Sequence, residues 1–477
     1  MNTRYLVFGS GKASKNALNI IENIGEIIAF TDNDSSKWGT LVGKYNVISP
    51  SDICDYDYDY ILICSRFADE IQSQLFNMGI SKIRLLVGGS LLYEYGIDNK
   101  LKPISFSETI CQSLKSKTLR VLFTQIYPCG RTNKLAEILH NNGVEVSLAY
   151  MNNFSDAMKS YLKYFKEVIP FYSFNDLVSY VNNSSYDIVH CSNEPDVLSC
   201  ILINSNKPII HDTHDFLSIR DIPNINMLAL EYIANTKCDG NLYASEDCMK
   251  MAIDRYGTNR NNAEFLYNLP SLAALPNISL KKLSKEDGQL HCVYEGGVSS
   301  NPSHFRYFEE QWTRVAKAGV HIHFYSQGDV DYCKRIADVH PNIHYEGNAD
   351  IEELLVLMTK YDIGWHVFNE FPAYKLKLDT TTSNKQYEYL ASGLPIVVSN
   401  HKRIRDMVET YDVGIVLDWT KDLNSQLKAA AEKKIGLDFV RDNKLTMEDQ
   451  AEKLISFYER IIYLFNQKHG DMITKCE

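Results

Sequence analysis

Short runs of apolar residues, each followed by an amphipathic segment, recur along the chain from Tyr5 to Phe465. This alternation is typical of parallel βα units, in which each buried strand is followed by a helix that covers the sheet. At roughly 150 residues per domain, a chain of 477 residues has room for about three such units. We therefore predict an α/β fold made of three consecutive Rossmann-like units, called here the first, second and third blocks.

Polar, strand-free stretches mark the expected boundaries between the blocks. The predicted organisation is a first block at 1–100, a linker at 101–117, a second block at 118–276, a linker at 277–289, a third block at 290–445 and a C-terminal helical segment at 446–477.

Composition excludes several classes of protein. The chain has 49 basic and 60 acidic residues, and a formal charge of −11 argues against nucleic-acid binding by overall phosphate neutralisation. Its eleven cysteines form no CxxC pair, and the N-terminus enters a strand pattern directly rather than a signal peptide. No run approaches the ~18 apolar residues of a membrane span. We expect a reduced, cytoplasmic protein.

The first block carries part of a dinucleotide fingerprint. Gly9 and Gly11 follow a strand, where they permit a tight turn and a close approach of phosphate, and Asp32 ends the next strand, where it suits ribose hydroxyls. Ser14 stands where the fingerprint has its third glycine or alanine. Two interpretations stay open: an accessory nucleotide or nucleotide-sugar site, or a plain strand–helix turn.

The third block holds the most informative stretch, residues 384–398, NKQYEYLASGLPIVV. Asn384 and Lys385 lie at a predicted helix start, where N–H dipoles and a lysine can hold a diphosphate. Glu388 lies one turn later and can accept two hydrogen bonds from a ribose diol. The alternative is an ordinary helix–strand joint with a solvated Glu388.

This stretch resembles the donor-binding motif of retaining, GT-B-fold glycosyltransferases of the group 1 type, which use nucleotide-sugar donors. Other segments agree in order with that family: Tyr294–Gly297, Asp187–His190, Pro208–Asp215 and Tyr267–Pro270. The resemblance covers residues 118–463. It implies that the second block binds the acceptor, that the third binds the donor, and that the C-terminal helix crosses back to the acceptor domain.

The resemblance also implies how the donor is held. Glu388 would bind the ribose, and Lys385, Asn384 and the Gly296-Gly297 loop would bind the diphosphate. Apart from the resemblance, Gly130 follows the first strand of the second block, where it either approaches the donor phosphates or belongs to a plain strand–helix connection. No Asp-x-Asp donor clamp stands in the stretch 384–398, so neither a metal nor a cofactor is expected. The chain departs from the family at Thr380, where many members have a second glutamate. The loop after Gly297 also lacks the usual arginine and lysine.

The acceptor side has three candidate catalytic residues. His214 and Asp215 follow a strand at the sheet edge where ligands usually bind, and His190 closes the neighbouring strand. Three interpretations remain open: acceptor positioning or proton transfer, a structural role, or a metal site, for which His-x-x-His alone supplies too few ligands.

A mixed lysine and aromatic stretch at 158–166 raises a peripheral membrane contact as an alternative to an ordinary solvated helix face. We predict a glycosyltransferase that moves a hexose-type sugar to a glycan, lipid-linked or protein acceptor in cell-surface polysaccharide or glycoconjugate synthesis. The alternative is a non-catalytic nucleotide-sugar-binding regulator. An epimerase or oxidoreductase is disfavoured, because the first block has no Tyr-x-x-x-Lys pair.

Overall fold

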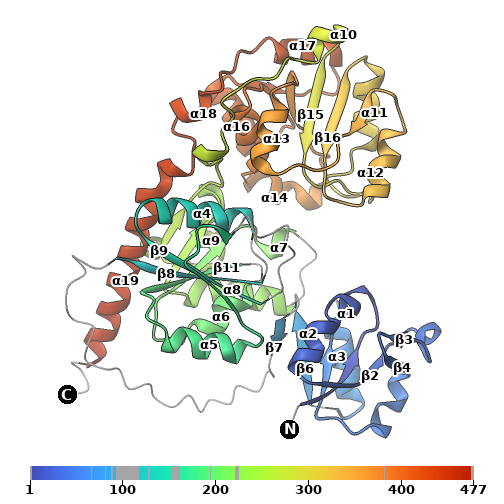
Figure 1. Cartoon of the computed structure of the whole chain (residues 1–477), viewed down its shortest axis with the longest axis vertical. Coiled ribbons are helices and arrows are strands. Elements are labelled where there is room, and N and C mark those ends of the chain that lie inside the picture. The colour runs from blue at the N-terminus through green and yellow to red at the C-terminus, as the bar shows by residue number, and fades with distance from the viewer. Residues whose placement is uncertain are drawn as a thin grey trace. The chain divides into compact units, whose positions relative to one another are not determined.

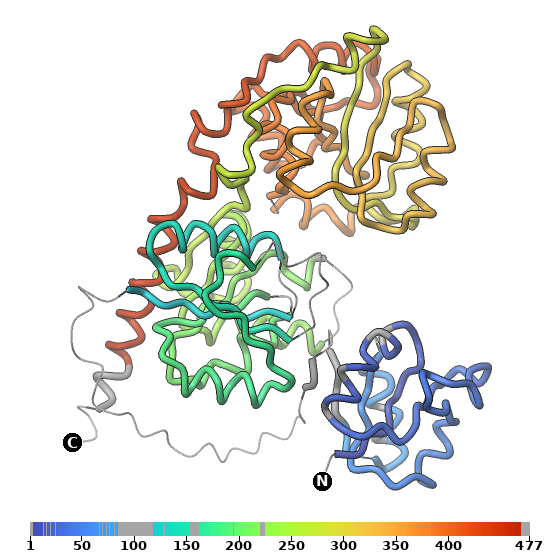
Figure 2. Tube along the Cα trace, viewed as in Figure 1, coloured from blue at the N-terminus to red at the C-terminus, as the bar shows by residue number. Residues whose placement is uncertain are grey.

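The computed structural model describes residues 3–65, 67–80, 82–87, 90–92, 118–126, 129–151, 162–193, 195–220, 225–380 and 382–473 (Figure 2). These residues fall into two compact units. One comprises 1–214, 224–241 and 458–477, and the other comprises 215–223 and 242–457. The predicted linker at 101–117 lies outside the described residues, as do residues 158–161 of the lysine and aromatic stretch at 158–166.

The first block is an α/β unit around a seven-stranded sheet of order β3-β4-β2-β1-β5-β6-β7. Parallel pairing links β4, β2, β1, β5 and β6, while β3 and β7 add antiparallel edges. Its elements are β1 Arg4–Phe8, α1 Lys12–Asn16, α2 Leu18–Ile24, β2 Glu26–Thr31, β3 Leu41–Val42, β4 Tyr45–Ile48, β5 Tyr60–Ile63, α3 Ala68–Asn77, β6 Ile83–Val87 and β7 Ser90–Leu92.

The second block also has a seven-stranded sheet, of order β10-β9-β8-β11-β12-β13-β14. In Figure 1, α4 lies on one side of β8, β9 and β11, and α5 and α6 lie on the other. Its elements are β8 Arg120–Gln125, α4 Gly130–Asn141, β9 Glu145–Tyr150, β10 Glu167–Pro170, α5 Phe174–Asn183, β11 Ile188–Ser192, α6 Val197–Leu202, β12 Ile209–Thr213, α7 Leu217–Arg220, α8 Ile225–Lys237, β13 Gly240–Tyr243, α9 Glu246–Tyr256 and β14 Ala263–Phe265.

The third block has a six-stranded, all-parallel sheet of order β17-β16-β15-β18-β19-β20. Its elements are α10 Ser284–Asp287, β15 His291–Glu295, α11 Glu309–Lys317, β16 His321–Tyr325, α12 Val330–Ala337, β17 Ile343–Tyr345, α13 Ile351–Met358, β18 Ile363–His366, α14 Lys375–Thr380, α15 Asn384–Ala391, β19 Ile396–Val398, α16 Lys402–Tyr411, β20 Gly414–Val416, α17 Leu423–Ala431, α18 Phe439–Asp442 and α19 Ala451–Ile473. Trp312, Ile336 and Leu427 belong to the apolar core that α11, α12 and α17 form on one face of this sheet.

A close contact fixes α15 against the third sheet. A β-carbon on Gly364 would lie only 2.4 Å from the Tyr389 ring, so the bare backbone of β18 is what lets α15 approach. The Tyr389 hydroxyl donates to the carbonyl of Trp365 and accepts from the amide of Glu295. The helix that carries Lys385 and Glu388 is thereby tied to the end of β15.

The prediction of three consecutive α/β units is confirmed. Gly130 is the first residue of α4, and α19 begins at Ala451, five residues into the predicted C-terminal helical segment. Short edge strands such as β10 and β14 were missed. A strand that pairs on one side alone does not need a continuous apolar run, so the sequence pattern does not mark it. Among the helices that the structure describes, none combines the length and apolar character needed to cross a bilayer.

Candidate functional site

The end of β15 runs into the glycine pair Gly296-Gly297. Gly296 has φ of +114°, a conformation that favours glycine, and a β-carbon there would stand 2.4 Å from Cε and 2.7 Å from Nζ of Lys385. The lysine side chain therefore lies against bare backbone at this loop. Lys385 is the second residue of α15, so its ammonium also lies near the positive end of that helix.

A second cation reaches the same loop. Nη1 of Arg306 lies 3.3 Å from the position that a β-carbon on Gly297 would take, and its Nε is buried without a hydrogen-bond partner. Within the part of the chain that the structure describes, neither Arg306 nor Lys385 forms an ion pair. Burial lowers the pKa of Lys385, and the charge of Arg306 lowers it further. Two neighbouring cations that form no ion pair make a site for an anion.

Carboxylates flank this pair of cations. Glu388 lies three residues after Lys385 on α15 and is 5% exposed, and Glu295 is the last residue of β15. The negative charges of both partly offset the fall in the Lys385 pKa. Asn384 is the first residue of α15 and is partly exposed. Glu388 is thus buried beside the cations rather than solvated, which argues against the ordinary helix–strand joint.

His366 completes the polar wall of this site. It ends β18 and is 3% exposed, and neither of its ring nitrogens has a hydrogen-bond partner. Burial holds the pKa of His366 well below its usual range, and the charge of Lys385 adds to this effect. A neutral imidazole here has one N–H to donate and one nitrogen to accept with.

The second block holds a different polar cluster, centred on Asp212 in β12. Arg131, in the first turn of α4, donates to both carboxylate oxygens through Nε at 2.9 Å and Nη2 at 3.0 Å. Nε2 of His190 lies 3.1 Å from Asp212, and Nε2 of His214 lies 3.2 Å from it. Arg131 and Asp212 are buried. One carboxylate therefore organises one arginine and two histidines.

Cys129 and His214 form a charged pair beside this carboxylate. Burial by itself raises the pKa of the Cys129 thiol, but the charge and hydrogen bond of His214 bring it down to about 6. Burial by itself lowers the pKa of His214, but Asp212 and Cys129 raise it to about 10. Cys129 also precedes α4 as its N-cap residue, and Gln125 donates to its sulfur at 3.3 Å. At neutral pH the pair is a thiolate and an imidazolium.

The three predicted catalytic residues have different environments. His190 is fully buried, its Nδ1 is hydrogen-bonded to the Tyr458 hydroxyl at 2.6 Å, and its ring stacks near Phe123 at 4.6 Å. These contacts favour the structural alternative for His190. His214 is partly exposed, and Asp215, the next residue, is also partly exposed. Gly130 has open space where a side chain would stand.

The first-block residues form a tight strand–helix turn. Gly9 has φ of +105°, and a β-carbon there would lie 2.7 Å from the Cys64 carbonyl, whereas Gly11 faces open space. The Asp32 carboxylate accepts from the Ser10 amide at 2.8 Å and its hydroxyl at 2.6 Å. The buried Ser14 hydroxyl donates to the Gly9 carbonyl, which explains why serine replaces glycine there. A nucleotide would have to displace Ser10 from Asp32.

Sequence reasoning found part of the third-block site and missed the rest. Gly296, Gly297, Asn384, Lys385 and Glu388 lie together as expected. The prediction that the loop after Gly297 lacks an arginine is wrong. Arg306 follows nine residues later, and its side chain lies against this loop. The only feature of His366 visible in the sequence is that it ends an apolar strand. In the second block, Cys129, Arg131 and Asp212 were missed as members of one cluster.

Two family models match parts of the chain. Residues 1–86 match the model described as C2185-like, N-terminal. Residues 298–437 match the model described as Glucosyltransferase 3-like, C-terminal domain, and this range contains Arg306, His366, Lys385 and Glu388. No curated protein matches the sequence of the chain.

Solved structures of glycosyltransferases are similar to the chain at low identity. Anabaena Alr3699/HepE in complex with UDP and glucose is 15% identical, covers 75% of this chain and 100% of its own, and has a TM-score of 0.49. AviGT4, a glycosyltransferase involved in avilamycin A biosynthesis, is 13% identical over 72% and 98%, with a TM-score of 0.46. An alpha-glucosyltransferase in complex with UDP and a DNA 13-mer is 16% identical over 75% and 100%, with a TM-score of 0.45.

Proposed function

We propose that this chain transfers a sugar from a nucleoside-diphosphate sugar to an acceptor, and that the third block binds the donor. The observation that carries the proposal is the convergence of Lys385 and Arg306 on the Gly296-Gly297 loop, where neither forms an ion pair with a residue that the structure describes. The match of residues 298–437 to a glucosyltransferase 3-like C-terminal domain supports the same assignment. A diphosphate is the ligand that best suits two cations, bare loop backbone and a helix N-terminus.

Each donor contact has a chemical purpose in this proposal. Lys385 and Arg306 neutralise the diphosphate, and they stabilise the charge that develops on it as the glycosidic bond to phosphate breaks. Glu388 accepts hydrogen bonds from the ribose hydroxyls. His366, buried and neutral, donates to a phosphate or sugar oxygen. Because these groups already stabilise the departing diphosphate, the proposed reaction requires no protein-bound metal.

The acceptor is proposed to be a glycan, a lipid-linked sugar or a glycosylated protein, and transfer is proposed to retain the anomeric configuration. His214 and Asp215 are the residues of the second block that would contact the acceptor, since both are partly exposed. His190, which is buried against Tyr458, would position that edge of the sheet rather than touch the acceptor. The cytoplasm, with the inner membrane face as a second site, is proposed as its location.

A panel of nucleotide sugars tests the proposal. The full chain is incubated with UDP-, GDP-, dTDP-, ADP- and CMP-linked sugars, and release of the free nucleotide is measured. We expect slow hydrolytic release from one donor, at a rate that falls by at least tenfold in Lys385→Met and stays unchanged in the control Lys421→Met, whose side chain is 71% exposed. Calorimetric binding of the same donor with no release of nucleotide would instead support the nucleotide-sugar-binding regulator, and absence of binding to every donor contradicts both functions.

A further inference from the structure

Four histidines gather on one face of the third sheet. His291 begins β15, His321 and His323 belong to β16, and His344 lies in β17. In the parallel register His291 pairs with His321, and His323 pairs with His344. Alternate residues of these strands, such as Ile322, belong to the apolar core of the opposite face. Side chains two apart along a strand share a face, so the histidines necessarily lie side by side.

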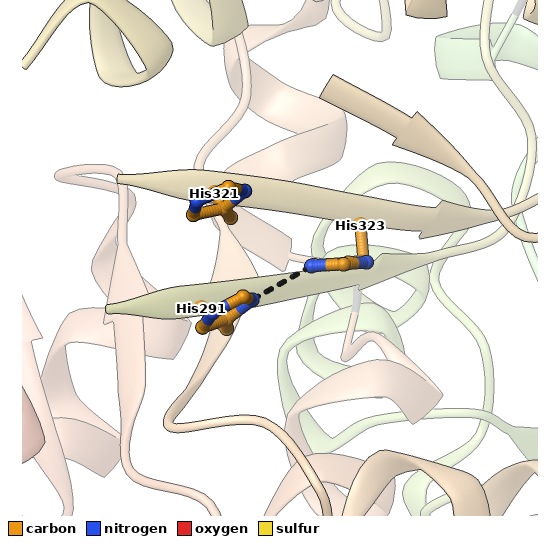
Figure 3. A group of neighbouring side chains, drawn as sticks. All are labelled: His291, His321 and His323. Carbon is orange, nitrogen blue, oxygen red and sulfur yellow. Dashed lines mark hydrogen bonds between the residues drawn. The ribbon is translucent and has the colours of Figure 1, made fainter. Parts of the chain in front are cut away.

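Three of these imidazoles converge on one point (Figure 3). Nδ1 of His291 lies 2.9 Å from Nε2 of His323, and one nitrogen from each of His291, His321 and His323 lies within 4.8 Å of the other two. His291 and His323 are 5% and 6% exposed, and His321 is partly buried. Nitrogens bound to one Zn²⁺ at about 2.0–2.1 Å stand roughly 3.3 Å apart. Because the His291 and His321 rings stack with their planes 9° apart, the His321 ring has to rotate for its nitrogen to face the same ion.

The remaining nitrogens of the three rings already have partners. Nε2 of His291 lies 3.0 Å from Asp287, and Nδ1 of His323 lies 2.7 Å from Glu346. Nδ1 of His321 lies 2.8 Å from Nε2 of His344. Nε2 of His321 is buried without a hydrogen-bond partner and lies 3.7 Å from Asp287, the carboxylate that also contacts His291. Histidines that bind metals almost always donate their other N–H to a carboxylate or a similar acceptor, which fixes the ring and its tautomer.

The hydrogen bonds around His291 and His323 need one proton more than two neutral imidazoles carry. Three contacts in a row, from Asp287 through His291 and His323 to Glu346, each need one proton. Two neutral imidazoles carry only two. If both carboxylates receive an N–H, two lone pairs face each other at 2.9 Å, and either a third proton or a metal ion bound by both nitrogens removes that repulsion.

We propose that His291, His321 and His323 bind one divalent transition-metal ion of the Zn²⁺ class, with Asp287 and Glu346 holding the outer N–H groups. Three imidazoles suit Zn²⁺, Co²⁺, Ni²⁺ or Cu²⁺ and not Mg²⁺ or Ca²⁺, which prefer oxygen. Gly296 lies five residues after His291 along β15, or about 16 Å in an extended strand. The metal is therefore remote from the donor phosphates, and the proposal stands independently of the proposed function. Its effect would be to tie β15 to β16.

The test uses full-length, untagged protein, because a polyhistidine tag would bind the same ions. The metal-free chain is titrated with Co²⁺ and Zn²⁺, and with Mg²⁺ as the ion that should not bind. We expect one equivalent of Co²⁺ to give a visible d–d spectrum that one equivalent of Zn²⁺ abolishes. Cu²⁺-loaded protein should show pulsed-EPR coupling to at least two imidazoles. At 100 times the Zn²⁺ dissociation constant the folding equilibrium should shift about 100-fold.

Variants separate this site from other ligands. His323→Gln should abolish the Co²⁺ spectrum, and Asp287→Asn should weaken Zn²⁺ binding by roughly 10–100-fold, since it only releases the outer N–H of His291. His140→Gln, at an exposed histidine of the second block, and Cys129→Ser should leave binding unchanged. If His323→Gln does not fold, the EPR count and Asp287→Asn decide. Unchanged affinity in both variants, coupling to fewer than two imidazoles, or no binding at 1 mM metal overturns the proposal.

Discussion

Nζ of Lys385 lies 2.7 Å from the position that a β-carbon on Gly296 would occupy. The end of the Lys385 side chain therefore occupies the space that a side chain on residue 296 would need. We predict that Gly296→Ala displaces the flexible end of Lys385 and lowers donor affinity by at least tenfold. The strain of a non-glycine residue at φ of +114° should also destabilise the fold by about 1–3 kcal/mol. Calorimetry with the donor and chemical unfolding measure the two effects.

Gly319 offers a matched control for this prediction. It has φ of +80° in the same block, but nothing lies within 4 Å of the place where its β-carbon would stand. Gly319→Ala should thus bring similar backbone strain and leave donor affinity unchanged. Equal loss of affinity in both variants would show that strain alone, and not displacement of Lys385, weakens binding.

The charges of Lys385 and Arg306 should act on the same ligand group. Methionine at either position keeps most of the apolar stem and removes the cation, and a charge-assisted hydrogen bond contributes about 1.5–3 kcal/mol. We predict that each of Lys385→Met and Arg306→Met weakens nucleoside-diphosphate binding roughly 10–100-fold, with a much smaller effect on the free nucleoside. A double-mutant cycle measures their coupling. If the nucleoside loses as much affinity as the diphosphate does, the cations do not bind phosphate.

Glu388 should recognise the ribose hydroxyls of the donor. The carboxylate is buried on α15, and its proposed partners are the 2′ and 3′ hydroxyls. A site built to hydrogen-bond a hydroxyl rejects the analogue that lacks it, because the polar group is left unpaired. We predict that the wild-type chain prefers the ribonucleotide over the 2′-deoxynucleotide and that Glu388→Gln, which has a similar shape, loses most of this preference. Competition binding with the two nucleotides measures it. An unchanged preference in Glu388→Gln would show that Glu388 does not bind the ribose hydroxyls.

The sequence predicted those features that follow from local patterns. Short apolar runs predicted most of the strands, and the segment from Asn384 to Glu388 predicted one helix and with it half of the candidate donor site. Arg306 was missed because its position depends on how the chain returns after Gly297, and no local pattern encodes that return. The histidine face was missed for a related reason. His291, His321 and His344 lie far apart in sequence, and only the order β17-β16-β15 brings them together.

The charge pair of Cys129 and His214 predicts an unusual pH dependence of alkylation. The pKa of Cys129 is lowered to about 6, so its thiolate is present above that pH and is lost as pH falls through it. We predict that iodoacetamide modifies Cys129 at a rate that stays nearly constant from pH 7 to 9. A cysteine in an unfolded reference peptide should instead react about ten times faster per pH unit up to roughly 8.5. Mass spectrometry of the two peptides follows both sites in one sample.

Removing His214 gives the opposite outcome for the same thiol. Without the imidazolium charge, burial dominates and raises the pKa of Cys129, so His214→Gln should move the inflection from about 6 to above that of an ordinary thiol. A variant whose Cys129 still reacts at a constant rate between pH 7 and 9 would show that the charge of His214 is not the cause.

Asp212 should contribute more to stability than any exposed ion pair of its block. Its carboxylate is fully buried and receives two hydrogen bonds from Arg131, which is only 3% exposed. Asp212→Asn leaves a buried arginine without its counter-charge, and removing one partner of a buried pair costs about 3–5 kcal/mol. Glu145→Gln, which breaks the exposed pair with Lys166, should cost under about 1 kcal/mol.

The stabilising contribution of Asp212 should depend on pH. Because the pKa of Asp212 is held well below its usual value, this contribution is present above pH 4 and is lost only as pH falls below that, whereas Asp212→Asn removes it at every pH. Urea unfolding at pH 7 and near pH 3 measures both, and equal losses in the two variants at pH 7 would contradict the role assigned to Asp212.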